Sequence, residues 1–573
     1  MLRILTLSTL CAALAAQATP SPFRFVPKDS CLVVRMAAPA VWQQRFAKTQ
    51  IVKLLRANTL APLVDQASAA FDGALGKLRE SGKFDASLVE KLLADYRGEV
   101  VFSVQVDWDR FAAAMQDDGK PPVSFVLALS PDASYDLAAL GSALEKLIEA
   151  EGGSPEPIRD LVVGDHRLRI GGDEDFQATL PAIIDGHLVM LGGAHLEQQA
   201  ARLLADKDRF DGHDGKAPLS VQLRLDRMLT TVLEMAGHEL EANTQLPFDF
   251  AQMVHDLGVN SLQDFELTID AHEKSVAIDY ELGLNDKERG LLGCFAFEHA
   301  RPKLLRFVPP AADQFSAVPI DFAAFYRVVE KIWTGLGDEV PLKFDDAMKT
   351  VAEHLKVRLK EDLLDRLGDE MLLLQDSEAV VAGASDPDDP TAGMGGMCLA
   401  ISLRDGKAFG EALETALRSR GLHAARKSED YAGTKIYTLK IAAVFEIEYA
   451  ITGDLALLAF GKGEASHRNL RGVLDARSAE GDTDAVPMAA KAHIQQLPAG
   501  WNGLGVTNMA AMLRSYEQAV EAMKNMDIDL PPEVSMVLKV LASVGGDLQR
   551  LGMQSMTSAS YATPRKIGVR MRW

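Results

Sequence analysis

The chain contains a long internal repeat. Residues 141–148 read Gly-Ser-Ala-Leu-Glu-Lys-Leu-Ile, and residues 410–417 read Gly-Glu-Ala-Leu-Glu-Thr-Ala-Leu, an offset of 269 residues. The same offset separates Gly164 from Gly433, and each of these glycines precedes a strand-like segment. A repeat of this length predicts that one architecture occurs twice along the chain.

The order of segments is also alike in the two copies. Each copy begins with Val-Pro, at residues 26–27 and 308–309, and continues into helix-like runs. Gly98 and Gly368 follow those runs at matching places, and we expect each glycine to cap the helix before it. Strand-like segments with apolar residues at every second position come next, a pattern typical of an antiparallel meander.

These patterns predict an α+β fold with two tandem homologous domains, residues 19–300 and residues 301–573. Each domain is expected to be a large, mostly antiparallel sheet with helices packed on one face. We prefer α+β to a doubly wound α/β fold because no regular strand-helix-strand rhythm with continuous apolar strands recurs.

The first 18 residues are typical of a cleaved secretory signal peptide. Arg3 precedes an uncharged apolar run at 4–16, and the small residues of Ala-Gln-Ala follow at 16–18. We therefore expect an exported protein, periplasmic or extracellular. No later stretch reaches about 18 uninterrupted apolar residues, so no membrane span is expected.

The net charge limits the expected partners, and the cysteine content limits the expected disulfide bonds. The formal net charge of −21 repels phosphate backbones, so nucleic acid is not an expected partner. Removal of the signal peptide leaves Cys31, Cys294 and Cys398. They could form one bridge plus a free thiol, or stay as three buried thiols, and their apolar neighbours favour the second arrangement.

The known catalytic and cofactor motifs are not found, so the sequence indicates no catalytic residue and no cofactor. One soft-metal candidate remains, in which Met394, Met397 and Cys398 would supply thioether and thiolate ligands to Cu(I). The alternative is that these side chains fill the core, as methionine often does. Met397 aligns with Phe125 of the first copy, which suits a buried strand position.

A family resemblance accompanies the repeat. Gly-x-Ala-Leu-Glu, then Tyr-Ala-Gly-Thr-Lys-Ile-Tyr at 431–437 and Ile-Thr-Gly-Asp-Leu at 451–455, resembles a family of exported bacterial proteins classified only as a domain of unknown function. The resemblance is clearest over residues 400–475 and fainter in the first copy. It implies secretion and two tandem copies, and it brings no active site with it.

The hypothesis that follows is an exported, non-catalytic binding or scaffold protein whose partner is a protein, a peptide or an apolar ligand. The recurring positions are glycines, aliphatic residues and helix caps, which serve packing. An extracytoplasmic hydrolase whose residues converge only in three dimensions is the alternative, and copper binding is a third. The sequence does not specify the ligand, the packing of the two halves or the oligomeric state.

Overall fold

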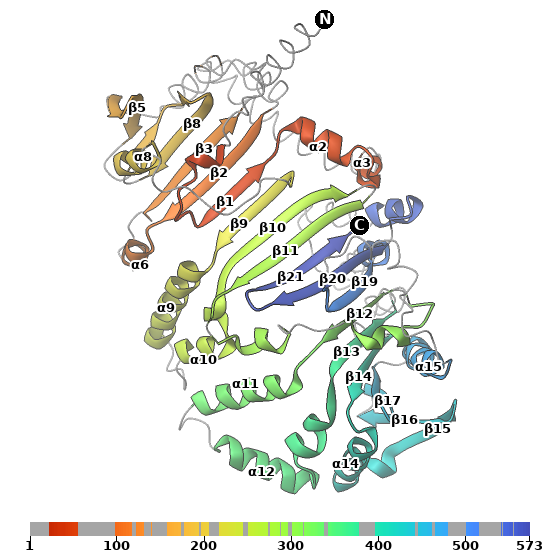
Figure 1. Ribbon diagram of the computed structural model, residues 1–573. Coiled ribbons are helices and arrows are strands. Elements are labelled where there is room, and N and C mark those ends of the chain that lie inside the picture. Colours follow the sequence, from red (N-terminus) through yellow and green to blue (C-terminus); the bar gives the residue numbers. More distant parts are fainter. Residues whose placement is uncertain are drawn as a thin grey trace, which may run out of the picture. The chain divides into compact units, whose positions relative to one another are not determined.

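A computed structural model gives the fold of most of the chain (Figure 1). The chain divides into two compact units. Unit 1 contains Met1–Ala47, Ala67–Met228 and Thr268–Asp270, and unit 2 contains Lys48–Gln66, Leu229–Leu267 and Ala271–Trp573. The expected signal peptide, residues 1–18, lies outside the described residues. The structure describes residues 22–55, 98–116, 122–130, 139, 142, 158–172, 177–193, 196–204, 217–243, 250–272, 275–286, 288–295, 301–312, 314–336, 342–376, 396–441, 445–460, 464–479, 500–514, 540, 543–553 and 555–573.

Unit 1 is built on an antiparallel sheet in which the strands pair in the order β4–β5–β6–β8–β3–β2–β1–β9, with β7 paired to β8. Helix α8 packs on this sheet through a buried face that includes Leu196, Ala200 and Leu203. The elements are β1 (Leu32–Met36), α2 (Pro39–Phe46), β2 (Glu99–Val106), α6 (Trp108–Gln116), β3 (Val123–Ser130), β4 (Arg159–Val163), β5 (His166–Gly172), β6 (Gln177–Thr179), β7 (Ala182–Ile184), β8 (His187–Gly193), α8 (Leu196–Leu204) and β9 (Leu219–Arg224).

Unit 2 has a larger antiparallel sheet, ordered β11–β21–β20–β19–β12–β13–β14–β18–β17–β16–β15. Its elements are α3 (Gln50–Leu55), most of α9 (Asp226–Asn243), α10 (Phe250–Leu257), most of β10 (Leu262–His272), β11 (Ser275–Leu284), β12 (Gln314–Pro319), α11 (Phe322–Gly335), α12 (Phe344–Leu355), β13 (Leu367–Gln375), β14 (Met397–Leu403), α14 (Gly406–Ser419), β15 (Arg426–Tyr431), β16 (Thr434–Ile441), β17 (Phe445–Ile451), β18 (Leu455–Phe460), α15 (Glu464–Ser478), β19 (Gly503–Asn508), β20 (Ser555–Thr563) and β21 (Lys566–Arg572).

The predicted α+β class is confirmed, since antiparallel strands and helices are interspersed along the chain. Five strands of each unit also follow one order, β8–β3–β2–β1–β9 in unit 1 and β18–β14–β13–β12–β19 in unit 2. Among the described helices, none combines the length and the apolar character needed to cross a membrane.

The boundary expected between residues 300 and 301 falls inside unit 2. Strand β11 precedes that boundary, yet it pairs with β21 near the other end of the chain, from Ala277 opposite Arg572 to Gly283 opposite Lys566. The pairing explains the difference, because hydrogen bonds between these distant strands place β11 in the same sheet as β12–β21.

One of the expected helix caps is wrong. Gly368 lies within β13, and a Cβ atom built at this position would be 2.2 Å from Ser402 Oγ on β14. The glycine therefore permits a close approach of two strands. The Ser402 hydroxyl uses that space to accept a hydrogen bond of 3.0 Å from the Glu370 backbone N–H. Gly98 stands directly before β2 in unit 1.

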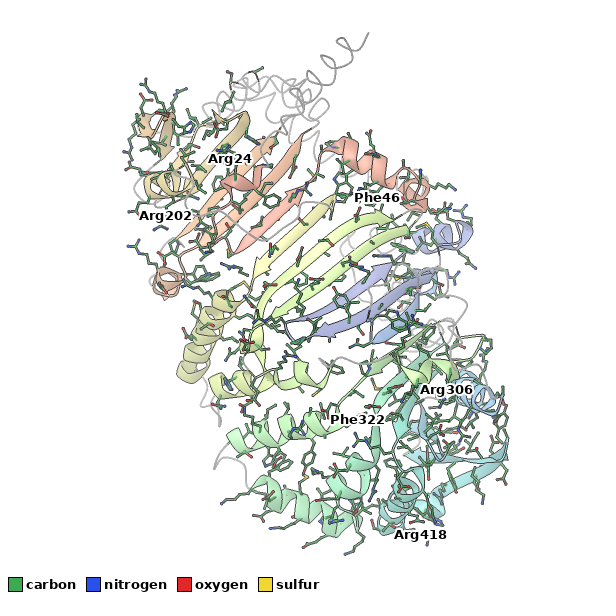
Figure 2. All side chains as sticks on the ribbon, in the orientation of Figure 1. Arg24, Phe46, Arg202, Arg306, Phe322 and Arg418 are labelled. Carbon is green, nitrogen blue, oxygen red and sulfur yellow. The ribbon has the colours of Figure 1, made fainter. Side chains whose placement is uncertain are left out.

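An Arg-Phe-Val-Pro segment occurs at 24–27 and again at 306–309, and its side chains make similar contacts in the two units. Phe25 and Phe307 are buried in the two cores. Arg24 forms an ion pair with Asp185, and Arg306 lies 3.9 Å from Asp454; both arginines are labelled in Figure 2. The two aspartates precede β8 and β18, so Asp454 occupies in unit 2 the place that Asp185 occupies in unit 1.

Cys31, Cys294 and Cys398 are unbridged and buried. Cys398 belongs to the core of unit 2, and burial raises the pKa of its thiol to about 12. Because thiolate is the reactive form, we expect the folded mature chain to be inert to Ellman's reagent at pH 8. Unfolding it in guanidinium without reductant should release three thiols per chain. A count of one would contradict the structure by revealing a bridge.

Candidate functional site

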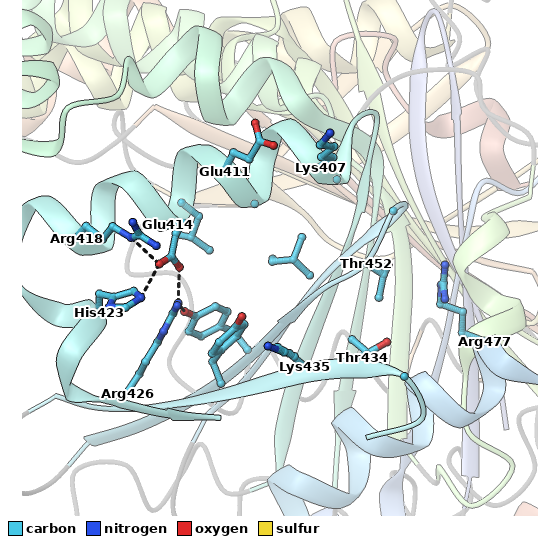
Figure 3. Close-up of a pocket in the computed structure, with 18 residues that line it drawn as sticks. Lys407, Glu411, Glu414, Arg418, His423, Arg426, Thr434, Lys435, Thr452 and Arg477 are labelled. Carbon is cyan, nitrogen blue, oxygen red and sulfur yellow. Dashed lines mark hydrogen bonds and ion pairs between the residues drawn. The ribbon is translucent and has the colours of Figure 1, made fainter. Parts of the chain in front are cut away.

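A groove of about 770 Å³ runs beside helix α14 in unit 2. Side chains of α14 form one wall, and residues of β15, β16 and β17 form the other (Figure 3). The turn after β17 and Arg477 of α15 close one end. We call this space the α14 groove.

Helix α14 is held against the turn that follows β17. Asp405 caps the helix by accepting a hydrogen bond of 3.0 Å from the Ala408 N–H. The Gly406 N–H donates to the carbonyl oxygen of Gly453 over 3.2 Å. A Cβ atom at Gly406 would lie 2.0 Å from the Thr452 carbonyl oxygen, so only glycine allows this contact. The position of the helix, and hence the width of the groove, depends on that residue.

One end of the groove is organised around Glu414, the glutamate of the second Gly-x-Ala-Leu-Glu segment. Its carboxylate accepts from Arg418 Nε at 3.0 Å and from Arg426 Nη1 at 2.6 Å, and His423 Nε2 lies 2.9 Å away (Figure 3). Burial alone would raise the pKa of Glu414, but the two arginines outweigh burial and hold this pKa below its usual value. Glu414 is therefore ionised and fully engaged.

Arg426 connects this carboxylate to two stacked tyrosines. Its guanidinium lies 4.1 Å from the ring centroid of Tyr437 and donates a hydrogen bond of 2.6 Å to Tyr449 Oη. The rings of Tyr437 and Tyr449 are stacked with their centroids 5.1 Å apart. Burial raises the pKa of Tyr449, although Arg426 opposes the shift. The network is thus a fixed wall whose polar groups already have partners.

At the other end of the groove, the Lys and Arg side chains form fewer ion pairs. Arg477 Nε is 2.9 Å from Asp454 Oδ1, which also accepts from the Thr452 hydroxyl at 3.0 Å. Lys407 and Lys435 are exposed and form no ion pair within the described part of the chain. In all, five Lys or Arg side chains and two glutamates line the groove, an excess of three positive charges in a chain of net charge −21.

The structure does not support a soft-metal site at the two candidate ligands that it describes, Met397 and Cys398. Met397 and Cys398 are consecutive in β14, and successive side chains of a strand point to opposite faces. Cys398 is buried in the core, whereas Met397 is half-buried. Met394 lies outside the described residues. Within the described residues, no three His, Cys, Asp or Glu side chains are placed so that they could hold a metal ion.

The groove residues themselves were not identified from the sequence. The signal was present, because Glu414 belongs to the repeated Gly-x-Ala-Leu-Glu segment and Lys435 and Tyr437 belong to the segment that carries the family resemblance. Their convergence depends on how α14 lies across β16 and β17. The first copy of the helix segment, residues 141–148, lies outside the described residues except for Ser142.

Comparisons with known proteins do not name a family. No family model matches the chain, and no curated protein matches it. Solved structures that match include crystal forms III, I and IV of TP0453, at 12%, 11% and 11% sequence identity. They cover 50%, 50% and 46% of this chain and 91%, 90% and 80% of their own, with TM-scores of 0.23, 0.23 and 0.22. TM-scores this low carry no argument about fold or function.

Proposed function

We propose that this chain is an exported, non-catalytic binding protein and that the α14 groove holds a ligand with a carboxylate or phosphate group. The observation that carries the proposal is the excess of positive charge in the groove of an acidic protein. Lys407 and Lys435 form no ion pair among the described residues, so their charges are available to an anion.

The state of the polar groups supports binding over catalysis. A general base must be free to take a proton. Glu414 is ionised but held by two arginines and His423, and Tyr449 is buried and hydrogen-bonded. The Thr452 hydroxyl is occupied in its own turn, where it donates to Asp454. Glu414, Tyr449 and Thr452 are therefore used to shape the groove.

The lining also favours one class of ligand. Charged residues and glycines dominate it, and the faces of Tyr437 are occupied by Arg426 and Tyr449. An apolar molecule would gain little there, whereas lysine and arginine form strong charge-assisted hydrogen bonds with oxyanions. Export is proposed on the pattern of residues 1–18 and on the resemblance to exported bacterial proteins of unknown function.

The test is calorimetric titration of the mature chain, starting at Thr19, with citrate and separately with inorganic pyrophosphate at low ionic strength. We expect one of these probes to bind and the double variant Lys407→Gln/Lys435→Gln to bind it about tenfold more weakly, because two of the cations have been removed. The affinity should also fall with added salt.

Lys427→Gln is the matched control, since Lys427 is exposed on β15 but does not line the groove. It should bind the probe as the wild type does. Failure of both probes to bind, or equal affinities for the wild type and the double variant, would refute the proposed site.

A further inference from the structure

A second kind of cavity occurs in both units, at matching places in the two sheets. In unit 1 a cavity of about 540 Å³ lies between the Val-Pro segment, the end of β2 and helix α8. In unit 2 a cavity of about 880 Å³ lies between the second Val-Pro segment, the end of β13 and helix α15. We call them the unit 1 and unit 2 proline pockets; they share Pro27 and Pro309, Gln105 and Gln375, and Gln199 and Asn469.

The shared amide is buried in both pockets. Gln199 is 8% exposed and Asn469 is 9% exposed. Gln199 Nε2 donates to Gln105 Oε1 at 3.2 Å and to the Phe125 carbonyl oxygen at 3.4 Å. Gln199 Oε1 is buried and accepts no hydrogen bond within the described part of the chain. A buried acceptor without a hydrogen bond costs free energy. We therefore expect a ligand to donate a hydrogen bond to this oxygen.

Arginine placement distinguishes the unit 1 pocket. Arg202, which is labelled in Figure 2, lies one helical turn after Gln199 on the same face of α8. It forms no ion pair among the described residues. In unit 2 the matching position is Gly472. The arginines of the unit 2 pocket are neutralised, since Arg468 lies 3.3 Å from Asp376 and Arg471 lies 2.5 Å from Glu429.

The acids of the unit 1 pocket are also engaged. Asp29 accepts a hydrogen bond from the Gln105 amide, and Asp107 lies 3.8 Å from Arg110. The remaining wall includes Pro27, which is buried, and the half-buried ring of Trp108. The unit 1 pocket thus offers an acceptor, an apolar wall and four cationic side chains, of which Arg202 lies on the same helix face as the acceptor.

We propose that the unit 1 proline pocket binds the C-terminal residue of a peptide. Such a residue carries an amide N–H and a carboxylate on the same Cα, which fits the Gln199 Oε1 acceptor and the Arg202 guanidinium on one helix face. Its side chain packs against Pro27 and Trp108. Capture of a terminal carboxylate is a known mode of peptide recognition. The unit 2 pocket keeps the amide but has no free arginine, so it does not take this ligand.

The experiment follows the fluorescence of the mature chain as the peptide acetyl-Gly-Gly-Ser-Ala-Leu is added up to millimolar concentration. The peptide is used with a free carboxylate and, in parallel, as the C-terminal amide. We expect the free acid to change the tryptophan emission and the amide to bind at least tenfold more weakly. The Trp108→Phe variant should lose the signal, which assigns it to this pocket.

Arg202→Gln should weaken binding of the free acid about tenfold and leave binding of the amide unchanged, because only the carboxylate contact is lost. Arg468→Gln in the unit 2 pocket is the matched control and should behave as the wild type. The proposal is overturned if the acid and the amide bind alike, if neither binds, or if Arg202→Gln has no effect. Binding of galacturonate without binding of the peptide would also overturn it, in favour of a sugar acid.

Discussion

Replacing Asp279 with alanine should destabilise unit 2 by about 3–5 kcal/mol, the cost expected when a buried cation loses its carboxylate. Asp279 lies on β11 and accepts from Arg570 Nε at 2.8 Å and from Arg572 Nη1 at 3.2 Å, both on β21. Arg572 is only 2% exposed. Removing the carboxylate deprives this buried guanidinium of its ion pair with Asp279.

Guanidinium unfolding followed by far-UV circular dichroism measures the effect. Asp346→Ala is the control, because Asp346 is exposed on α12 and its pair with Lys349, at 3.0 Å, is a surface contact. That substitution should cost less than about 1 kcal/mol. The double variant Asp279→Ala/Arg572→Met should recover part of the loss, since it replaces the buried guanidinium with an apolar side chain. Equal stability losses for Asp279→Ala and Asp346→Ala would contradict the assignment.

Gly406→Val should destabilise unit 2 by about 1–3 kcal/mol and also abolish the binding of citrate or pyrophosphate that we propose for the α14 groove. The added Cβ would lie 2.0 Å from the Thr452 carbonyl oxygen and 2.8 Å from the Gly453 carbonyl carbon, and both are backbone atoms. Relief of this clash requires α14 to move away from the turn. Because Glu414 and Lys407 are on that helix, the groove would change with it.

Gly453→Ala is the matched control on the other side of the same contact. A Cβ atom at Gly453 meets no atom within 4 Å, so we expect a change of less than about 0.5 kcal/mol. Thermal unfolding of both variants measures the effect on stability, and calorimetric titration with citrate or pyrophosphate measures the effect on binding. If Gly406→Val unfolds and binds as Gly453→Ala does, the glycine is not what sets the position of the helix.

Local sequence patterns predicted the fold class but did not predict which distant strands pair. Period-two alternation over the segments that form β16–β18 predicted an antiparallel meander, but β15 was not predicted. Gly433 occupies a turn with φ of 78° between β15 and β16. The β11–β21 pair could not be predicted in this way. Asp279 and Arg572 are 293 residues apart, and alternation within a strand does not reveal its neighbour.

The candidate site was even less accessible to sequence reasoning. Arg426 and Glu414 are separated by a turn and a short helix, and their contact depends on how α14 lies across the sheet. Gly368 shows a related limit, because its place in the chain suited a helix cap while its packing against Ser402 is a contact between two strands. Residue type and spacing indicate local geometry, whereas the convergence of charges is a property of the tertiary structure.

The pairing of β11 with β21 has a consequence for biosynthesis. A ribosome finishes β11 long before it makes β21, so the sheet of unit 2 stays open until the last strand has emerged. Contacts this distant in sequence slow folding, and unpaired strand edges expose a nascent chain to aggregation. In the exported protein that we propose, a secretory route that carries chains unfolded would let the two strands first meet after translocation.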